Sequence, residues 1–329
     1  MRRTGAIVFI TCVALATLLG CARDQSTEIP LTVATAPFES LGLVYVAEDR
    51  GMFEDHGLDV TFTRHDTGVA TLDSVIAGEA DIAVGTAEFP LVQKAFAGVP
   101  VRALATIDRP DFIYLVGRKD HGVSQPSDLK GKRIGTTAGS VAQFYLGRFL
   151  ELNGMTAEEI TFVDLRAQNE WRTAISDGTV DAVVLAQPEA SLVQGRLGEN
   201  AAFFSVQGNQ PIYTLALGMH DWIDEHPETV KRFLAALADA EEWVAANPEG
   251  TVDIIRERLK LTDEYAARVG EQNSFALSLD QSLIVAMEDQ ARWMIGNKLT
   301  TETAVPDFVG YIHADALLSV KPGAVDRLR

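Results

Sequence analysis

The sequence predicts an α/β protein of two lobes, each a mostly parallel sheet flanked by helices, with a helical C-terminal extension. The main indication is a pattern that occurs twice, at Ile76–Asp81 and again at Ser176–Asp181. Each copy reads as the end of a helix, a capping glycine, a tight turn and an aspartate, and a short apolar strand follows. Strand-like and helix-like segments alternate upstream of both copies. Two such units form a cleft between them, and clefts between lobes bind ligands.

Residues 1–20 are predicted to be a lipoprotein signal peptide. Met1–Arg3 is a short basic segment, and Ile7–Leu19 is apolar but too short to span a membrane. Leu18–Cys21 resembles the lipobox of bacterial lipoproteins, in which the cysteine, here Cys21, is lipidated and becomes the mature N-terminus. We therefore expect an extracytoplasmic protein that is anchored through Cys21 in the lipid bilayer of a bacterial membrane. The alternative is an ordinary secretory signal that contains a cysteine.

Composition excludes several classes of function. Both cysteines of the chain, Cys12 and Cys21, lie in or next to the leader, so the mature domain has no disulfide and no thiol nucleophile. A net charge of −18 disfavours nucleic acid as a partner, because phosphate binding needs clustered Lys and Arg. The six histidines include no pair at metal-binding spacing. We expect no cofactor and no metal, and a monomer.

Lobe one is assigned to residues 30–108 and 212–329, after a flexible tether at residues 21–29 that is polar and without periodicity. Its first part is expected to contain strands at 31–34, 58–63, 81–84 and 101–107, and helices at 41–49, 69–77 and 88–97. Ile212–Met219 reads as a strand that returns from lobe two. From Trp222 onward the pattern is helical, with a helix after Pro227 and further helices at 263–273, 280–296 and 307–318.

Lobe two is assigned to residues 109–211. Strands are expected at 112–116, 132–135, 160–163 and 182–185. Val141–Leu152 has the apolar spacing of a helix and ends at Asn153-Gly154. Asp108–Asp111 and Gln207–Pro211 join the two lobes, and we interpret them as hinges.

Four segments in order carry a family resemblance. They are Gly51–Val60, Ala77–Ile82, Asp128–Gly135 and Gly178–Ala182. They resemble the G-x-F-x-x-x-G-L-x-V, A-G-x-x-D, D-L-K-G-K-x-I-G and G-x-x-D-A segments of the periplasmic substrate-binding proteins that serve sulfonate, taurine, nitrate and thiamine-precursor ABC importers. The resemblance covers residues 31–247 and implies a type II periplasmic-binding fold that closes on a ligand and delivers it to the transmembrane subunits of an ABC permease. The motif residues themselves, such as Gly78 and Asp81, have structural explanations as caps and turns.

The candidate site follows from geometry, because ligands in open α/β sheets bind beyond the carboxyl ends of the strands. Six loops qualify: 35–38, 64–67 and 86–89 in lobe one, and 136–140, 164–167 and 186–189 in lobe two. The turn before Ser140 is the strongest, since its free N–H groups and the dipole of the following helix suit an anion or a carbonyl oxygen. The alternative is that Ser140 only caps the helix. The candidate ligand-binding residues are Thr35, Phe38, His65, Asp66, Thr86, Glu88, Gly139, Ser140, Gln187 and Glu189.

The function predicted from the sequence is a solute-binding lipoprotein of an ABC transporter, which captures a small organic or sulfonate- or nitrate-like molecule without chemistry. The six loops carry Asp66, Glu88, Asp164 and Glu189 against Arg64 and Arg166, which favours a neutral or cationic organic ligand such as a pyrimidine. Two alternatives stay open. One is an enzyme like the thiamine-pyrimidine synthases on the same fold, although they have a Cys-rich motif and no cysteine follows Cys21 here. The other is a lipoprotein adaptor that binds another protein.

Overall fold

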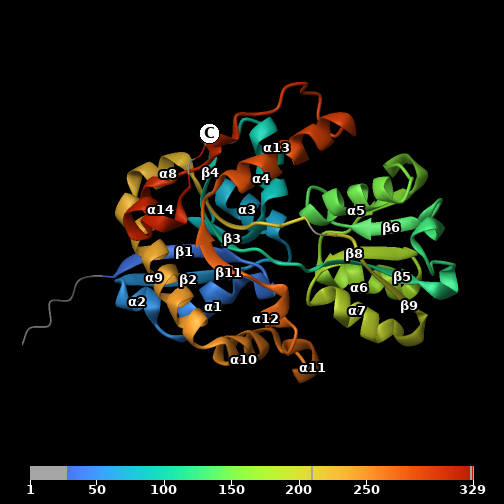
Figure 1. Cartoon of the computed structure of the whole chain (residues 1–329), viewed down its shortest axis with the longest axis horizontal. Helices are drawn as coiled ribbons and strands as arrows, with labels where there is room; N and C mark the ends of the chain where they lie inside the picture. The colour runs from blue at the N-terminus through green and yellow to red at the C-terminus, as the bar shows by residue number, and fades with distance from the viewer. Residues whose placement is uncertain (1–27, 209, 327, 329) are drawn as a thin grey trace, which may run out of the picture.

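A computed structural model describes residues 28–208, 210–326 and 328, which form two α/β lobes side by side (Figure 1). The leader, Cys21 and residues 22–27 of the tether lie outside these residues. Strand β1 begins at Ile29, which the sequence assigned to the tether. Within the described ranges, no helix combines the length and the apolar character needed to cross a bilayer.

Lobe one contains a six-stranded sheet with the order β2-β1-β3-β10-β4-β11. Strands β1 to β4 run in one direction, and β10 and β11 run against them. The strands are β1 (Ile29–Thr35), β2 (Leu58–Arg64), β3 (Ile82–Ala87), β4 (Val101–Asp108), β10 (Thr214–Met219) and β11 (Phe275–Ser278). The helices are α1 (Gly42–Asp49), α2 (Met52–Asp55), α3 (Gly68–Ile76), α4 (Glu88–Phe96), α8 (His220–Glu225), α9 (Pro227–Ala246), α10 (Pro248–Leu259), α11 (Asp263–Ala266), α12 (Val269–Gln272), α13 (Gln281–Gly296) and α14 (Asp315–Val320).

Lobe two contains a five-stranded sheet with the order β7-β6-β8-β5-β9, in which β5 runs against the other strands. Its strands are β5 (Ile113–Arg118), β6 (Arg133–Thr136), β7 (Thr161–Asp164), β8 (Ala182–Ala186) and β9 (Ala201–Ser205). Its helices are α5 (Val141–Leu152), α6 (Gln168–Asp177) and α7 (Glu189–Leu197). Apart from the edge strand β11, both sheets thus have the same strand order when the strands of a lobe that run in one direction are counted along the chain. The order is second, first and third strand, then the strand that runs in the opposite direction, and then the fourth strand. The reversed strand is β10 in lobe one and β5 in lobe two, so each is the first strand after a crossover.

The aspartate of each repeated motif makes the same pair of hydrogen bonds in its own lobe. Asp81 accepts a hydrogen bond from the Thr32 N–H through Oδ2 at 2.8 Å, and its own N–H donates to the Thr32 carbonyl at 2.9 Å. Asp181 makes the same two bonds with Arg133, at 2.9 and 2.8 Å. The glycine three residues before each aspartate has a positive φ, 73° and 81°, which favours glycine at the end of a helix. The motif therefore ties the turn before the third strand to the first strand of the same lobe.

The chain passes between the lobes twice, through residues 109–112 (crossover one) and 206–213 (crossover two). Gln207 ties the two crossovers together. Its Oε1 accepts from the Phe112 N–H at 3.0 Å, and its Nε2 donates to the Pro110 carbonyl at 2.7 Å and to the Gln210 carbonyl at 3.0 Å. The two segments therefore lie side by side at the junction of the lobes.

The lobes also touch through helix α5, which packs on α4 and α13 of lobe one. The ring of Phe144 stacks on Phe89 at 5.6 Å and meets Trp293 edge-on at 5.2 Å. The indole Nε1 of Trp293 donates to Glu151 at 2.9 Å. Buried side chains of both lobes belong to one continuous apolar core at this contact.

The C-terminal region differs from the sequence prediction in two places. The helix expected at 263–273 is divided into α11 and α12 at residues 267–268. Tyr265 of α11 and Asn273, which follows α12, both turn their side chains to the buried carboxyl group of Glu39. Strand β11 follows at once and was not predicted. The helix expected at 307–318 is a 3₁₀ turn (Phe308–Tyr311) and then α14, because the His313 N–H donates to the Ala103 carbonyl of β4 at 2.9 Å instead of to a helical partner.

Candidate functional site

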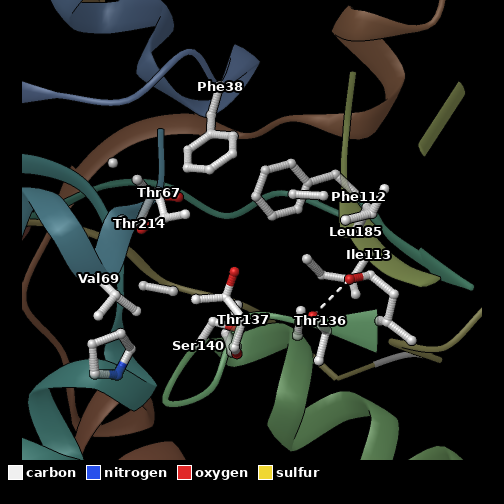
Figure 2. Close-up of a pocket in the computed structure, with 18 of the residues that line it drawn as sticks. Phe38, Thr67, Val69, Phe112, Ile113, Thr136, Thr137, Ser140, Leu185 and Thr214 are labelled. Carbon is white, nitrogen blue, oxygen red and sulfur yellow. Dashed lines mark hydrogen bonds between the residues drawn. The ribbon is translucent and has the colours of Figure 1, made fainter. Parts of the chain in front are cut away.

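A cavity of about 70 Å³ lies between the lobes, beyond the carboxyl ends of strands from both sheets (Figure 2). Its walls come from loops and helix starts of lobe one and lobe two in roughly equal measure. The residues that line it are Phe38, Thr67, Gly68, Val69, Gly85, Ala87, Pro90, Phe112, Ile113, Thr136, Thr137, Ser140, Val141, Ala142, Trp171, Val184, Leu185, Ala186 and Thr214. None of them carries a charge, so the cavity wall is apolar with a few hydroxyl groups.

Aromatic rings form one side of the cavity. Phe38, which precedes the first turn of lobe one, meets Phe112 of crossover one edge-on, with the ring centroids 6.1 Å apart (Figure 2). Trp171 of α6 is held by a hydrogen bond from its Nε1 to the Leu165 carbonyl at 2.8 Å. Because each partner already fixes the ring, these side chains offer preformed flat surfaces.

Hydroxyl groups line other parts of the wall, among and beside these rings. Thr136 donates to the Val184 carbonyl and Thr137 to the Leu165 carbonyl, both at 2.7 Å (Figure 2 shows the first bond). The Thr67 hydroxyl accepts from the Ala70 N–H at 3.1 Å and so caps α3. Ser140 donates to the Thr137 carbonyl at 2.7 Å. The hydroxyl hydrogens of Thr136, Thr137 and Ser140 are therefore committed, and those oxygens face a ligand mainly as acceptors.

Two helix N-termini approach the cavity from opposite lobes. Gly68 and Val69 open α3 of lobe one, and Val141 and Ala142 open α5 of lobe two. Within the described residues none of these four N–H groups has a hydrogen-bond partner. The first N–H groups of a helix lack intrahelical acceptors and carry the positive end of the helix dipole. This end of the cavity therefore suits an anionic or strongly polar oxygen group.

The turn before α5 departs from the prediction in one respect. Its N–H groups are not free, because Ala138 donates to Asp164 at 2.8 Å and Gly139 donates to Gln143 at 2.7 Å. The free N–H groups lie one step later, in the helix itself. Gly139 has a φ of 76°, and a Cβ atom there would lie 2.5 Å from Oε1 of Gln93 in lobe one. The positive φ of the turn thus favours glycine, and a larger residue would also have to displace the Gln93 side chain of the other lobe.

The structure brings two of the predicted residues, Phe38 and Ser140, to the cavity, and Gly139 lies next to Ser140. Thr35, His65 and Asp66 line a second cavity of about 240 Å³, together with Arg64 and Arg258. This second cavity lies in lobe one, against the same two loops that bring Phe38 and Thr67 to the cavity between the lobes.

The other four predicted residues are buried beside the cavity. Thr86 bonds with Thr71 at 2.6 Å, and Glu88 accepts from the Tyr213 N–H at 2.9 Å. Gln187 accepts from the Ser191 N–H through Oε1 at 3.1 Å, while its Nε2 has no partner within the described residues. Glu189 pairs with Arg172. None of these four side chains lines the cavity, and a role in ligand binding stays a prediction for them.

The charges of the six predicted loops do not reach the cavity wall. Glu189 is neutralised by Arg172, and Asp164 pairs with Arg166 at 2.7 Å. Glu88 is fully buried, and burial raises its pKa to about 7. The argument from loop charges for a neutral or cationic ligand therefore loses its basis.

Several lining residues were missed in the sequence. Thr67 could have been found, since a threonine before a helix start is a typical N-cap. Phe112 and Thr214 lie where the chain passes from crossover to strand, and Trp171 lies inside a helix, so no loop signal marks them. Within the described part of the chain, no group of His, Asp and Glu side chains could hold a metal ion.

Comparisons with known proteins agree with this geometry. The model of a family described as NMT1/THI5 like matches residues 40–251, more than half of the chain. YtlA of Bacillus subtilis, whose name describes it only as a binding protein, is 28% identical over 227 residues, 67% of this chain and 67% of YtlA. The 4-amino-5-hydroxymethyl-2-methylpyrimidine phosphate synthase of Uromyces fabae is 23% identical over 230 residues, 63% of this chain and 64% of the synthase.

Solved structures show the same fold. The alkanesulfonate-binding protein SsuA from Xanthomonas axonopodis pv. citri, bound to MOPS, is similar with a TM-score of 0.75 and 18% identity, over 87% of this chain and 98% of SsuA. The periplasmic nitrate-binding protein NrtA from Synechocystis PCC 6803 has a TM-score of 0.69 and 14% identity, over 90% of this chain and 89% of NrtA. These likenesses confirm the two-lobed periplasmic-binding fold that the sequence predicts.

Proposed function

The chain belongs to the NMT1/THI5-like family, and we propose that it is an extracytoplasmic solute-binding lipoprotein that captures one small molecule between its lobes and delivers it to an ABC permease. The observation that carries the proposal is the shared cavity. Neither lobe forms it alone, and each contributes one helix N-terminus to it. A ligand that contacts both lobes stabilises the arrangement in which they touch, which is how a binding protein signals that it is loaded.

The cavity supports a ligand with two parts. The rings of Phe38, Phe112 and Trp171 favour a flat or apolar body, and the N–H groups at the starts of α3 and α5 favour an oxygen-rich head group. A sulfonate-like organic molecule fits both parts, and a small anion such as nitrate fits the second. MOPS in SsuA and nitrate in the name of NrtA are consistent with this class.

The size of the cavity implies that the lobes separate to admit the ligand. Pockets for organic molecules usually measure roughly 300–1,000 Å³. The volume between the lobes is about 70 Å³, with Gly139 of one lobe against Gln93 of the other. An organic ligand therefore needs the lobes to lie further apart than they do here, both to enter and to be held.

An enzyme is the second candidate, because relatives include pyrimidine phosphate synthases. The residues that line the cavity include no histidine, lysine or cysteine, and no cysteine follows Cys21 in the sequence. His65 lies in the other cavity, where it bonds with Thr63 at 3.3 Å. The cavity therefore offers hydrogen bonds and flat surfaces, and none of the residues that line it is a base that could activate a serine or threonine hydroxyl for covalent chemistry.

The decisive experiment is native mass spectrometry of the freshly purified full chain. We expect a complex with one small molecule that is lost after unfolding and refolding. Thermal unfolding with taurine, MOPS, nitrate and an aminopyrimidine as probes then ranks the classes, since only a ligand of the folded form raises the midpoint. Ser140→Ala should reduce the ligand-induced increase in the midpoint of thermal unfolding. Glu158→Gln, at an exposed position, should leave that increase unchanged.

Each alternative predicts a different result. A converted product in a single-turnover experiment would identify an enzyme. The absence of any bound small molecule, together with no stabilisation by the four probes, would contradict the proposal and favour an adaptor that binds another protein.

A further inference from the structure

A buried carboxyl group lies next to one end of each crossover between the lobes. Asp108 is the last residue of β4 and leads directly into crossover one. Glu88 opens α4 and accepts from the N–H of Tyr213, the last residue of crossover two, at 2.9 Å. Both side chains are completely buried. Because these two segments must change conformation whenever the lobes move, the state of the two carboxyl groups is linked to the lobe arrangement.

The polar groups around Glu88 can form hydrogen bonds with its carboxyl group in the uncharged, protonated state. Its Oε1 accepts from Gln290 Nε2 at 2.6 Å, while Gln290 Oε1 has no partner within the described residues. If the amide of Gln290 turns over, its free carbonyl oxygen takes the position next to Glu88 and accepts a hydrogen bond from the protonated carboxyl group. The titratable groups that face Glu88 are the phenols of Tyr145 on α5 and Tyr213 on crossover two, and no cation pairs with it within the described residues.

The surroundings of Asp108 stabilise a charged carboxylate even less than those of Glu88 do. Neither carboxyl oxygen makes a hydrogen bond of normal geometry within the described residues, although the N–H groups of Arg109 and Ser274 lie nearby. The guanidinium of Arg109 is turned to Asp280 and Ser278 instead. The other titratable groups around Asp108 and its neighbour Glu39 are Asp111, Tyr114, Tyr265 and Arg268.

We propose that the lobes take up protons when they close, because the closed arrangement holds Glu88 and Asp108 as uncharged carboxyl groups. The inference rests on the proposed function, since closing around a ligand is the event that it describes. Tyr145 of α5 faces Glu88 and donates to the Pro211 carbonyl of crossover two at 3.2 Å. An opening motion that displaces Tyr145 or crossover two would admit water to Glu88. A hydrated carboxyl group gives up its proton at neutral pH.

The direction of the pH effect follows from linkage. Burial raises the pKa of Glu88 to about 7 and the pKa of Asp108 well above its usual range. The closed form therefore binds more protons than the open form. Protonation stabilises the closed form relative to the open form fully at low pH, and this stabilisation is lost as the pH rises through the raised pKa values. For each proton taken up, the ratio of closed to open molecules falls by at most about tenfold per pH unit.

The test measures the distance between spin labels on the full ligand-free chain by double electron–electron resonance. The labels are placed with Leu192→Cys on α7 and Glu264→Cys on α11, which line opposite sides of the gap between the lobes. Cys12→Ser and Cys21→Ser remove the other thiols. We expect the short-distance population to grow as the pH is lowered from about 8.5 to about 5.5, and the growth should begin near the pKa of about 7 for Glu88.

The variants assign the effect. Glu88→Gln and Asp108→Asn each mimic the uncharged acid, so each should increase the short-distance population at high pH and flatten the titration. Glu158→Gln, an exposed carboxylate of lobe two, should titrate like the parent chain. Either buried variant decides the question if the other does not fold.

Two results would overturn the inference: a distance distribution that does not change with pH, or an unchanged titration in a folded Glu88→Gln or Asp108→Asn chain. The proposed function has a separate readout. A compound found by native mass spectrometry should shorten the distance at fixed pH, whatever the outcome of the pH titration.

Discussion

Trp293 of α13 and Gly147 of α5 pack so closely that a Cβ atom on Gly147 would lie 2.1 Å from Cζ2 of the indole ring. The two residues belong to different lobes, and the contact continues into the rings of Phe144 and Phe89. Glycine in the middle of a helix costs about 0.5–1 kcal/mol relative to alanine, so its presence in α5 is explained by this approach. The C-terminal helix α13 is thus a third connection between the lobes, in addition to the two crossovers.

Gly147→Ala should destabilise the protein, because the added methyl group collides with a large ring that is held on all sides. Overpacking of this kind costs about 1–3 kcal/mol. The matched control is Gly195→Ala in α7, where a Cβ atom would meet nothing within 4 Å. Since alanine favours a helix, the control should be neutral or slightly stabilising. Urea unfolding monitored by circular dichroism compares the two, and equal midpoints would contradict the packing argument.

Asp181 should make lobe two sensitive to acid. Burial opposes the ionisation of Asp181, but the Arg133 guanidinium and N–H and the His121 ring outweigh it and lower the pKa of the carboxyl group. A lowered pKa gives stability that is present above the usual pKa of an aspartate and is lost as the pH falls toward the lowered value. Asp181→Asn should therefore be less stable than the parent at pH 7 and should lose less stability on acidification.

Arg133→Gln tests the same relationship from the other side. It removes the guanidinium, which donates to Asp181 at 2.6 Å, and keeps the backbone bond. Its acid transition, followed by tryptophan fluorescence, should move to higher pH than that of the parent chain. If both variants unfold in acid like the parent, the ion pair has no role in acid stability.

The sequence was informative where a local rule determines the structure. A glycine cap, a turn and an aspartate predicted two matching strand–helix units, because each motif bonds to the first strand of its own lobe, as Asp81 does with Thr32. The helix boundaries of α4, α5 and α13 agree with the prediction to within a residue for the same reason. Caps and periodicity act within a few residues.

The sequence was less informative where distant residues decide. The side chains of Tyr265 and Asn273, at the two ends of the α11–α12 segment, bond to Glu39, more than two hundred residues away. The charged loop residues were expected at the ligand, but Glu189 is neutralised by Arg172 of the neighbouring helix α6, and Glu88 turns to Tyr213. Pairing of this kind depends on the packing of the elements, and no local pattern encodes it.

Closing of the lobes is expected to be visible in solution. If the lobes rotate about the two crossovers, a bound ligand should shift the population toward the compact form. Small-angle scattering of the full chain should show a smaller radius of gyration at saturation with a compound identified by native mass spectrometry. A radius that does not change on saturation would count against rotation about these segments.

Cys21 is expected to anchor the protein. The residue lies outside the described part of the chain, and the prediction depends on the lipobox at Leu18–Cys21. Expressed in a bacterial host, the parent chain should fractionate with membranes and carry diacylglycerol, and Cys21→Ala should be released or remain unprocessed. Cys12→Ala is the matched control and should stay at the membrane. A membrane-bound, lipid-modified Cys21→Ala chain would show that the anchor lies elsewhere.

The start of α5 should contribute more to ligand affinity than any histidine of the chain. Ser140 lines the cavity beside the free N–H groups of Val141 and Ala142, whereas His65 lies in the second cavity. Ser140→Ala removes the hydroxyl that donates to the Thr137 carbonyl and so holds the turn before these N–H groups. Loss of one hydrogen bond costs about 0.5–1.5 kcal/mol, so the variant should weaken binding roughly two- to tenfold. Gly139→Val should do worse, because a φ of 76° is strained for a branched side chain and the turn itself would distort, and the new side chain would displace that of Gln93. His65→Ala should bind almost like the parent chain. Titration calorimetry on the three variants, with the compound found by native mass spectrometry, decides between the two cavities. If Ser140→Ala and Gly139→Val bind almost normally and His65→Ala does not bind, the ligand lies in the second cavity.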